Sequence, residues 1–184
     1  MGVSIGHNGG PSMDEGLSWR RHCWSKARAD LLPVLPIEVV RLRVKRAAEL
    51  GLDYRTYAGV RAQTGHDLVG FLFSSNALGL LRAGDTVPVA RMEKLAGLVA
   101  ERVGLSRPGL SPGAMLQACP PLTGAAPGPA PLAAWAQARD ALRSALRGVP
   151  GDRMLLVGDA PWEADWAAIG RLAGHLPAAR FFAA

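Results

Sequence analysis

Two short, uninterrupted apolar stretches constrain the fold of this 184-residue chain more than any other feature. Residues 68–73 read Leu-Val-Gly-Phe-Leu-Phe, and residues 153–158 centre on Met-Leu-Leu-Val. A stretch that is apolar on both faces is typical of a strand buried in a parallel sheet, although a short buried helix has the same pattern. A helical pattern over 161–174 and the residues 180–183 follow the second stretch. We interpret this order as strand, crossover helix and strand, which favours parallel pairing.

The sequence therefore predicts a helix-rich α/β fold with a small parallel sheet. About three strands are expected, near residues 68–73, 154–158 and 180–183. A mostly α fold is the alternative, because periodicity alone does not decide whether residues 68–73 are strand or helix. Apolar residues at helical spacing predict further helices at 18–32, 37–50, 53–63, 88–103 and 132–147.

The distribution of Pro and Gly sets the expected domain organisation. Residues 1–17 are rich in Gly and are expected to be a flexible segment. Residues 18–184 are expected to form one domain with a basic helical N-terminal part. Within that domain, Pro and Gly recur through residues 104–131, which predicts a long irregular connection.

The chain has a formal net charge of +6, and its basic excess is concentrated in the first third. A basic surface attracts nucleic acid, acidic proteins and anionic lipid without choosing among them. Neither a membrane span nor a signal-peptide pattern is present, so we expect a cytoplasmic protein with no membrane partner. The cysteines and histidines are scattered singly. This pattern predicts reduced thiols and no metal site, and no motif implies a cofactor.

Residues 37–64 have the pattern of two helices joined by a tight turn. Ala47, Gly51, Leu52, Tyr57 and Val60 occupy the small, glycine and hydrophobic positions of a generic DNA-binding helix-turn-helix, which this segment resembles. An ordinary helical hairpin with a glycine cap fits the same pattern. The resemblance implies that the nucleic acid would be contacted by Arg41, Arg43, Lys45, Tyr54, Arg55, Thr56 and Arg61.

Short polar side chains follow both predicted strands. Ser74, Ser75 and Asn76 follow the first, and Asp159 follows the second. Ligands of parallel sheets bind beyond the carboxyl ends of the strands, and free amides at a helix start favour an anion. We therefore treat these four residues as candidates for a small-ligand or phosphate site formed by 74–76 and 159–165. The same residue types are also common in turns and helix caps.

The two strand ends also resemble the later motifs of haloacid-dehalogenase-type phosphatases. In that family an apolar strand ends in Ser or Thr, and a Gly-Asp pair follows further along the chain. The resemblance implies a phosphatase-like placement of Ser74 and Asp159. Such enzymes also need an upstream Asp-x-Asp strand for the nucleophile and the acid, and the chain has none. We therefore expect at most a relative without catalytic activity.

Three functions follow from these observations. The first, favoured by charge and spacing together, is a non-catalytic nucleic-acid-binding or regulatory protein that uses residues 37–64 to bind DNA or another anionic partner. The second is an α/β ligand-binding domain or enzyme that uses the strand ends. The third is an adaptor that binds a protein partner through its basic helices or residues 1–17. No residue is predicted to be catalytic.

Overall fold

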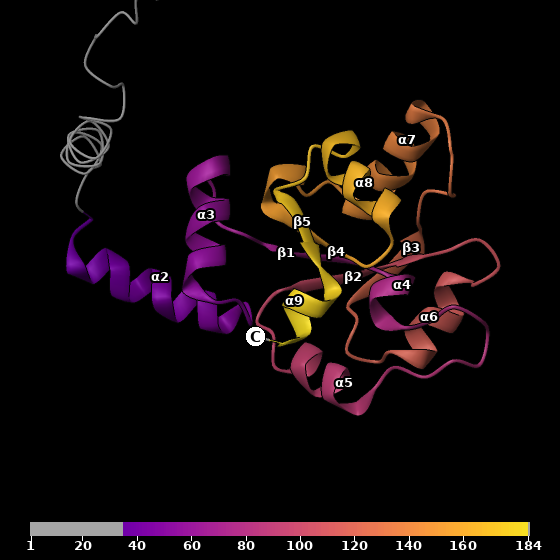
Figure 1. Cartoon of the computed structure of the whole chain (residues 1–184), viewed down its shortest axis with the longest axis horizontal. Helices are drawn as coiled ribbons and strands as arrows, with labels where there is room; N and C mark the ends of the chain where they lie inside the picture. The colour runs from indigo at the N-terminus through magenta and orange to yellow at the C-terminus, as the bar shows by residue number, and fades with distance from the viewer. Residues whose placement is uncertain (1–34, 184) are drawn as a thin grey trace, which may run out of the picture. The chain divides into compact units, whose positions relative to one another are not determined.

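The computed structural model describes residues 35–183 (Figure 1). The chain divides into two units, residues 1–40 and 41–184, and residues 35–40 are the described part of the first. The segment expected at 1–17 and the helix expected at 18–32 lie outside the described residues. The helices and strands are α2 (Ile37–Glu49), α3 (Tyr54–Thr64), β1 (Gly70–Ser74), α4 (Ser75–Leu78), α5 (Val89–Ala96), β2 (Glu101–Ser106), α6 (Pro112–Ala118), β3 (Gly124–Pro127), α7 (Trp135–Leu146), η1 (Gly151–Arg153), β4 (Met154–Gly158), η2 (Pro161–Glu163), α8 (Ala164–Ile169), β5 (Gly174–Pro177) and α9 (Ala178–Ala183).

Five strands form one sheet in the order β3-β2-β1-β4-β5, and every neighbouring pair is parallel. The α/β fold with a parallel sheet is thereby confirmed, and residues 70–74 are strand rather than helix. β1 is the central strand, with Phe71 beside Arg102 of β2 on one side and Leu155 of β4 on the other. Every residue of β1 and β4 is buried, which is why both strands have uninterrupted apolar sequences.

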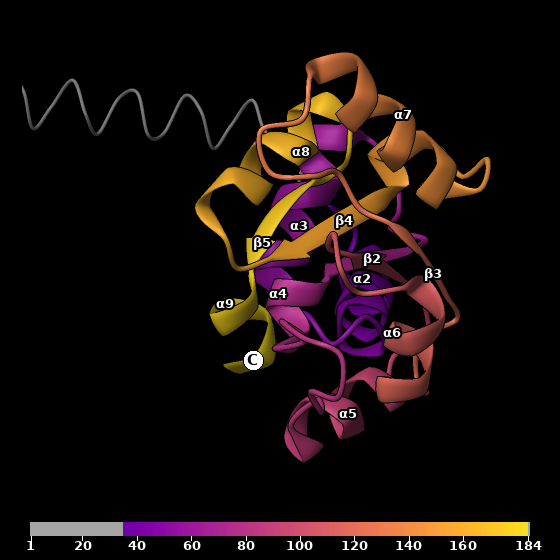
Figure 2. The ribbon, with the colours of Figure 1, turned by 90° about the vertical axis from the view of Figure 1, so that its right-hand side faces the viewer.

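Helices cover both faces of the sheet (Figure 2). Phe71, Phe73 and Val157 point into a core that contains side chains of α2, α3, α4, α5, α6 and α9. Leu72 and Leu156, which alternate with them, point into a second core formed with α7 and α8. Alternate side chains of each central strand therefore belong to different cores, as the two-residue repeat of a strand requires. No helix among residues 35–183 has the length and apolar character that a membrane crossing needs.

The strand expected at 180–183 is wrong, because these residues belong to α9. The run is rich in Ala, a strong helix former. The helix also places Phe181 against Phe71 and Phe73, with ring centroids 5.2 and 5.4 Å apart. The strand in this part of the chain is β5. It follows α8 and begins at Gly174, the residue at which the expected helix 161–174 would end.

Two further strands, β2 and β3, lie where helix or irregular chain was expected. The helix expected over 88–103 ends at Ala96, and Val103 belongs to β2 instead. Residues 104–131 are not one irregular connection, because they contain the end of β2, all of α6 and all of β3. Ser111 caps α6 by accepting a hydrogen bond from the Ala114 amide. β3 is an edge strand, a position that tolerates Pro127.

Candidate functional site

The strand order places a switch point beside the central strand. From β1 the chain moves outward to β2 and β3 on one side, and then crosses to β4 and β5 on the other. At such a point the connections that leave the two strands diverge, and a crevice forms beyond their carboxyl ends. The ends of β1 and β4 are followed by residues 74–76 and 159–165, which are the two stretches expected to form a site. The topology therefore brings them together.

Glu163 connects the two strand ends. Its buried carboxylate accepts hydrogen bonds from Ser74 Oγ at 2.8 Å and from Asn76 Nδ2 at 2.7 Å. It also accepts bonds from the backbone amides of Asp159 at 2.7 Å and Ala160 at 3.1 Å. Hydroxyl, side-chain amide and backbone amide donors thus converge on one carboxylate. Bonds to a charged acceptor are stronger than neutral ones, so this arrangement fixes the ends of β1 and β4 relative to each other.

Local sequence explains why the donors converge. Ser74 is the N-cap of α4, and its Oγ also accepts a hydrogen bond from the Ala77 amide at 3.0 Å. The amides of Asp159 and Ala160 precede the helical turn that Pro161 begins, where backbone N–H groups have no partner within the helix. Such amides bind an anion readily, and here the Glu163 carboxylate is that anion.

A small cavity of about 90 Å³ opens beside this network. Its walls are largely apolar, with two indoles and three prolines, while Asn76, Arg107 and Glu163 add polar groups. Trp162 is 47% exposed at the cavity, whereas Trp166 is buried. The lining residues come from the ends of β1, β2, β3 and β4: Ser75, Asn76, Leu105, Arg107, Pro108, Pro129, Pro131, Trp162, Glu163 and Trp166.

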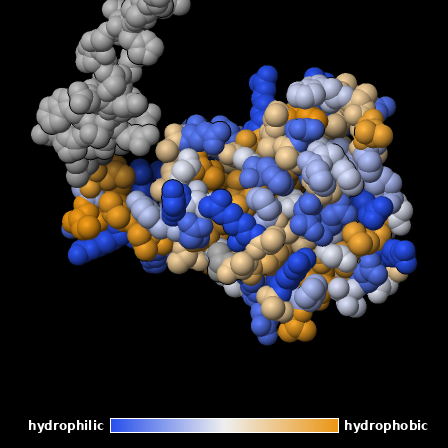
Figure 3. Space-filling model, viewed as in Figure 1, coloured by the Kyte–Doolittle hydropathy of each residue, from blue (hydrophilic) through white to orange (hydrophobic). Residues whose placement is uncertain are grey.

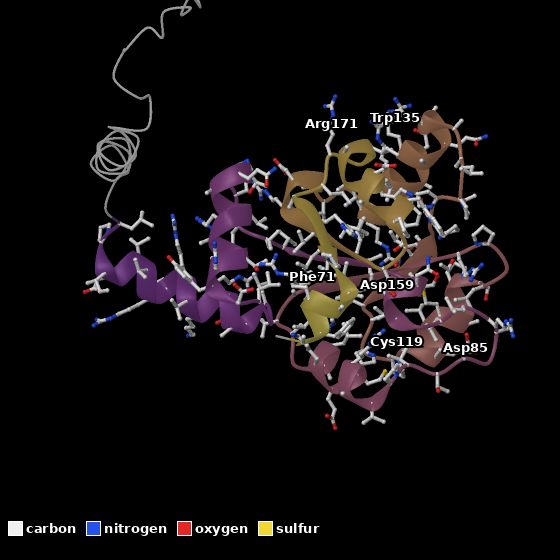
Figure 4. All side chains as sticks on the ribbon, in the orientation of Figure 1. Phe71, Asp85, Cys119, Trp135, Asp159 and Arg171 are labelled. Carbon is white, nitrogen blue, oxygen red and sulfur yellow. The ribbon has the colours of Figure 1, made fainter. Side chains whose placement is uncertain are left out.

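The four candidate residues differ in their placement. Ser74 and Ser75 are buried, Asn76 is half-buried, and the Asp159 side chain is exposed. Figure 4 shows Asp159 at the carboxyl edge of the sheet, close to α4. Asp159 contributes to the network through its backbone amide. The central position of Glu163 was not predicted, because it depends on β1 and β4 being neighbours.

His175 is a further residue near the network that sequence reasoning did not identify. Its Nε2 atom is buried and has no hydrogen-bond partner among the described residues. A Cβ atom on Gly158 would lie 2.8 Å from this nitrogen and 2.8 Å from Glu163 Oε2, so glycine is required where the three groups meet. Burial lowers the pKa of His175, and the nearby Glu163 carboxylate partly opposes that shift. Burial therefore favours the neutral form of the imidazole.

The helix-turn-helix candidates lie on α2 and α3, and several basic groups there hold the hairpin on the sheet. Arg46 donates to the Asp67 carboxylate at 3.1 Å and to the Leu68 carbonyl at 3.0 Å. Tyr57 is buried and donates to Asp67 at 2.6 Å, and Arg61 lies 3.5 Å from the same carboxylate. Burial and the hydrogen bond to Asp67 raise the pKa of Tyr57. Arg61 is therefore paired with Asp67 within the fold.

The remaining basic candidates do not form one row. An α-helix turns by about 100° per residue, so Arg43 lies about 200° around α2 from both Arg41 and Lys45. In Figure 3 the hydrophilic side chains of the face shown are interspersed with hydrophobic ones, not gathered over α2 and α3. The basic side chains of α2 therefore lie on different sides of the helix.

At the start of α3, some candidate side chains are exposed and one forms hydrogen bonds within the protein. Tyr54 and Arg55 are exposed. Thr56 donates from Oγ1 to the Asp53 carboxylate and accepts a hydrogen bond from Arg180 at 2.7 Å. The hydrogen bonds from Thr56 lower the pKa of Asp53. Nucleic-acid contact by Tyr54, Arg55 and Thr56 stays a prediction.

The resemblance to haloacid-dehalogenase-type phosphatases required an Asp-x-Asp strand ahead of the strand that ends at Ser74. Among the described residues that strand, β1, is the first in the chain. No described strand therefore occupies the position that the family's nucleophile would need. In comparisons with known proteins, no family model matches the chain, and no curated protein or solved structure matches it either.

Proposed function

We propose that residues 41–184 form a domain that binds a small, flat, uncharged organic ligand in the strand-end cavity. One observation supports this most directly: the ends of four strands converge at the switch point on a cavity whose polar groups are held in place by Glu163. Rigidly held polar groups beside apolar walls are typical of small-molecule sites. The proposal concerns binding and assigns no reaction.

An uncharged ligand is favoured because the position for an anion is already filled. A phosphate at this edge of the sheet would be held by the backbone amides of Asp159 and Ala160. Both amides donate to Glu163, together with Ser74 and Asn76. An incoming phosphate would have to displace a carboxylate with these bonds, and its own charge would be repelled by that carboxylate.

The shape and lining of the cavity favour a flat group. Trp162 and Trp166 provide aromatic surfaces, and Pro129 and Pro131 supply rigid apolar contacts. Because Asn76 Nδ2 donates to Glu163, its Oδ1 atom is left to accept a hydrogen bond from a ligand. A volume of about 90 Å³ is well below that of sites for drug-sized molecules. One planar ring with a polar edge fits this description.

Nicotinamide is a suitable probe, because it combines a flat ring with a neutral amide. We would titrate the ¹⁵N-labelled full chain with nicotinamide and, separately, with inorganic phosphate. Nicotinamide should shift the Asn76 side-chain signals and the Trp162 indole signal, whereas phosphate should leave the Asp159 and Ala160 amide signals unchanged. Trp162→Ala should weaken nicotinamide binding by roughly tenfold, the effect expected for loss of one stacking ring.

Trp135→Ala is the matched control, because Trp135 is exposed on α7 and does not line the cavity. It should bind nicotinamide as the unaltered chain does. The proposal fails if nicotinamide causes no saturable shifts at the cavity, or if the two tryptophan variants weaken binding equally.

Nucleic-acid binding through residues 37–64 is a second proposal, supported by the exposure of Tyr54 and Arg55 at the start of α3. It predicts retention on duplex DNA that decreases steeply with salt. Arg55→Gln should reduce that retention, whereas Arg82→Gln, a matched change in the loop between α4 and α5, should not. Retention that is weak at low salt and independent of both changes would exclude it.

A further inference from the structure

A second cavity, of about 430 Å³, lies at the opposite, amino-terminal edge of the sheet. It is formed by one face of α7, by the turn that leads into β4, and by the end of α8. Its apolar surface comes from Leu146, Val149 and Ile169, and its volume lies within the range of small-molecule sites. The full lining is Arg139, Arg143, Leu146, Gly148, Val149, Gly151, Ile169, Gly170 and Arg171.

Among residues 35–183, three arginines and no carboxylate line this cavity. Arg139 and Arg143 are four residues apart on α7, so their side chains share one face of that helix. Arg171 reaches the cavity from the residue after Gly170, at the end of α8. Arg139 pairs with Asp140 at 3.2 Å, but within residues 35–183 the guanidinium groups of Arg143 and Arg171 have no hydrogen bond and no ion pair. The cavity therefore has an excess of positive charge.

The backbone at Arg171 has an unfavourable conformation for its residue type. Its φ angle is 50°, in the left-handed region where glycine is favoured and side chains with a Cβ are strained. The Arg171 amide bonds to the Ala168 carbonyl and the Leu172 amide to the Ala167 carbonyl, the pattern of a helix end at which glycine usually stands. Residues with a strained backbone are found more often at ligand-binding and active sites than elsewhere.

At the floor of the cavity, the backbone around Gly151 contacts the backbone around Arg171. A Cβ atom on Gly151 would lie 2.5 Å from the Gly170 carbonyl oxygen and 2.8 Å from that of Arg171. The turn before β4 and the end of α8 therefore lie too close together for a side chain at residue 151. The Gly151 carbonyl also accepts a hydrogen bond from the Ala173 amide at 3.1 Å. The position of Arg171 relative to β4 is thus set by backbone contacts.

We propose that this arginine-lined cavity binds a small organic molecule that carries a phosphate group. Guanidinium groups form paired, charge-assisted hydrogen bonds with phosphate oxygens, and three of them can surround one phosphate. Leu146, Val149 and Ile169 supply contacts for an apolar part of the ligand. The site is separate from the strand-end cavity and does not depend on its ligand.

Arg171→Gly gives a sharp test, because the change removes the guanidinium and also relieves the backbone strain. Binding of phenyl phosphate to the full chain would be measured by calorimetry at constant ionic strength. The unaltered chain should show saturable binding, and Arg171→Gly should raise the Kd by about tenfold. The melting temperature of the variant should be equal or higher, because glycine is favoured at this φ. Arg143→Gln should weaken binding to a similar degree.

Arg147→Gly is the matched control. Arg147 also has a left-handed backbone, with φ of 49°, but it does not line the cavity. This variant loses the same charge and should keep the Kd of the unaltered chain. The proposal is overturned if phenyl phosphate shows no saturable binding, if Arg171→Gly binds it normally, or if Arg147→Gly weakens binding as much as Arg171→Gly does. Tighter binding of single-stranded DNA than of phenyl phosphate, lost in Arg171→Gly, would also overturn the small-molecule form of the proposal.

Discussion

Replacing Glu163 tests whether its carboxylate holds β1 and β4 together. Glu163→Ala removes the acceptor of four hydrogen bonds and leaves the Ser74 hydroxyl buried without it. Each bond to a charged acceptor contributes about 1.5–3 kcal/mol, but the contributions of one cluster do not add, and water can reach the Asp159 and Ala160 amides. We expect Glu163→Ala to lower the free energy of unfolding by about 3–5 kcal/mol, the range for a broken buried charged group.

Glu163→Gln separates the loss of charge from the loss of the acceptor. The Gln oxygen can accept from Ser74 and the two backbone amides, and the Asn76 amide can turn so that its oxygen faces the Gln nitrogen. We expect a cost of about 1–2 kcal/mol. Both variants would be measured by urea unfolding monitored by circular dichroism, with Glu93→Ala on the exposed side of α5 as the control. A loss below about 1 kcal/mol for Glu163→Ala, or equal losses for Ala and Gln, would refute the description of this network.

Further predictions concern a thiol, two glycines and an arginine. Burial raises the pKa of Cys119 from 9.0 to about 11, so the stability that its neutral form provides is present below pH 9 and lost as the pH rises to 11. At pH 10 the unaltered chain should have lost about 1.4 kcal/mol more than Cys119→Ala in urea unfolding, and equal losses would contradict the shift. Gly70→Ala should lower the free energy of unfolding by about 1–3 kcal/mol, because the added Cβ would press on the Glu101 carbonyl oxygen. Gly59→Ala, with no atom within 4 Å of the new Cβ, should stabilise the chain by about 0.5–1 kcal/mol, and the same sign for both glycine variants would be inconsistent with the packing. Arg46→Ala should cost about 1–3 kcal/mol through its four hydrogen bonds, and a cost near zero by the same assay would show that they do not hold the hairpin.

The central part of the fold could be predicted because β1 and β4 are buried on both faces. That burial leaves an uninterrupted apolar sequence, which is the clearest signal a short strand can give. β2 begins with the exposed Glu101, and its Val103 fits a helical repeat with Val99, so the strand was assigned to a helix. β3 and β5 are edge strands of four residues, too short to establish an alternating pattern.

The polar residues of the strand-end site could be predicted, but not their arrangement. Ser74 and Asn76 were recognised as strand-end side chains, because their types and positions are local features of the sequence. Their common acceptor, Glu163, lies 89 and 87 residues further along the chain, and the contact requires β4 to lie beside β1. The left-handed backbone at Arg171 could not be predicted, because sequence rules assign such positions to glycine.

The position of β1 between β2 and β4 has a consequence for the order in which the protein matures. A nascent chain that has emerged only as far as β3 can complete one side of the central strand, while its other edge still lacks a partner. That edge carries Phe71, Leu72 and Phe73, a sequence well suited to pairing with other chains. Synthesis of residues 154–158 therefore supplies the partner for this edge of β1, and chains terminated before β4 should depend on chaperones to stay in solution.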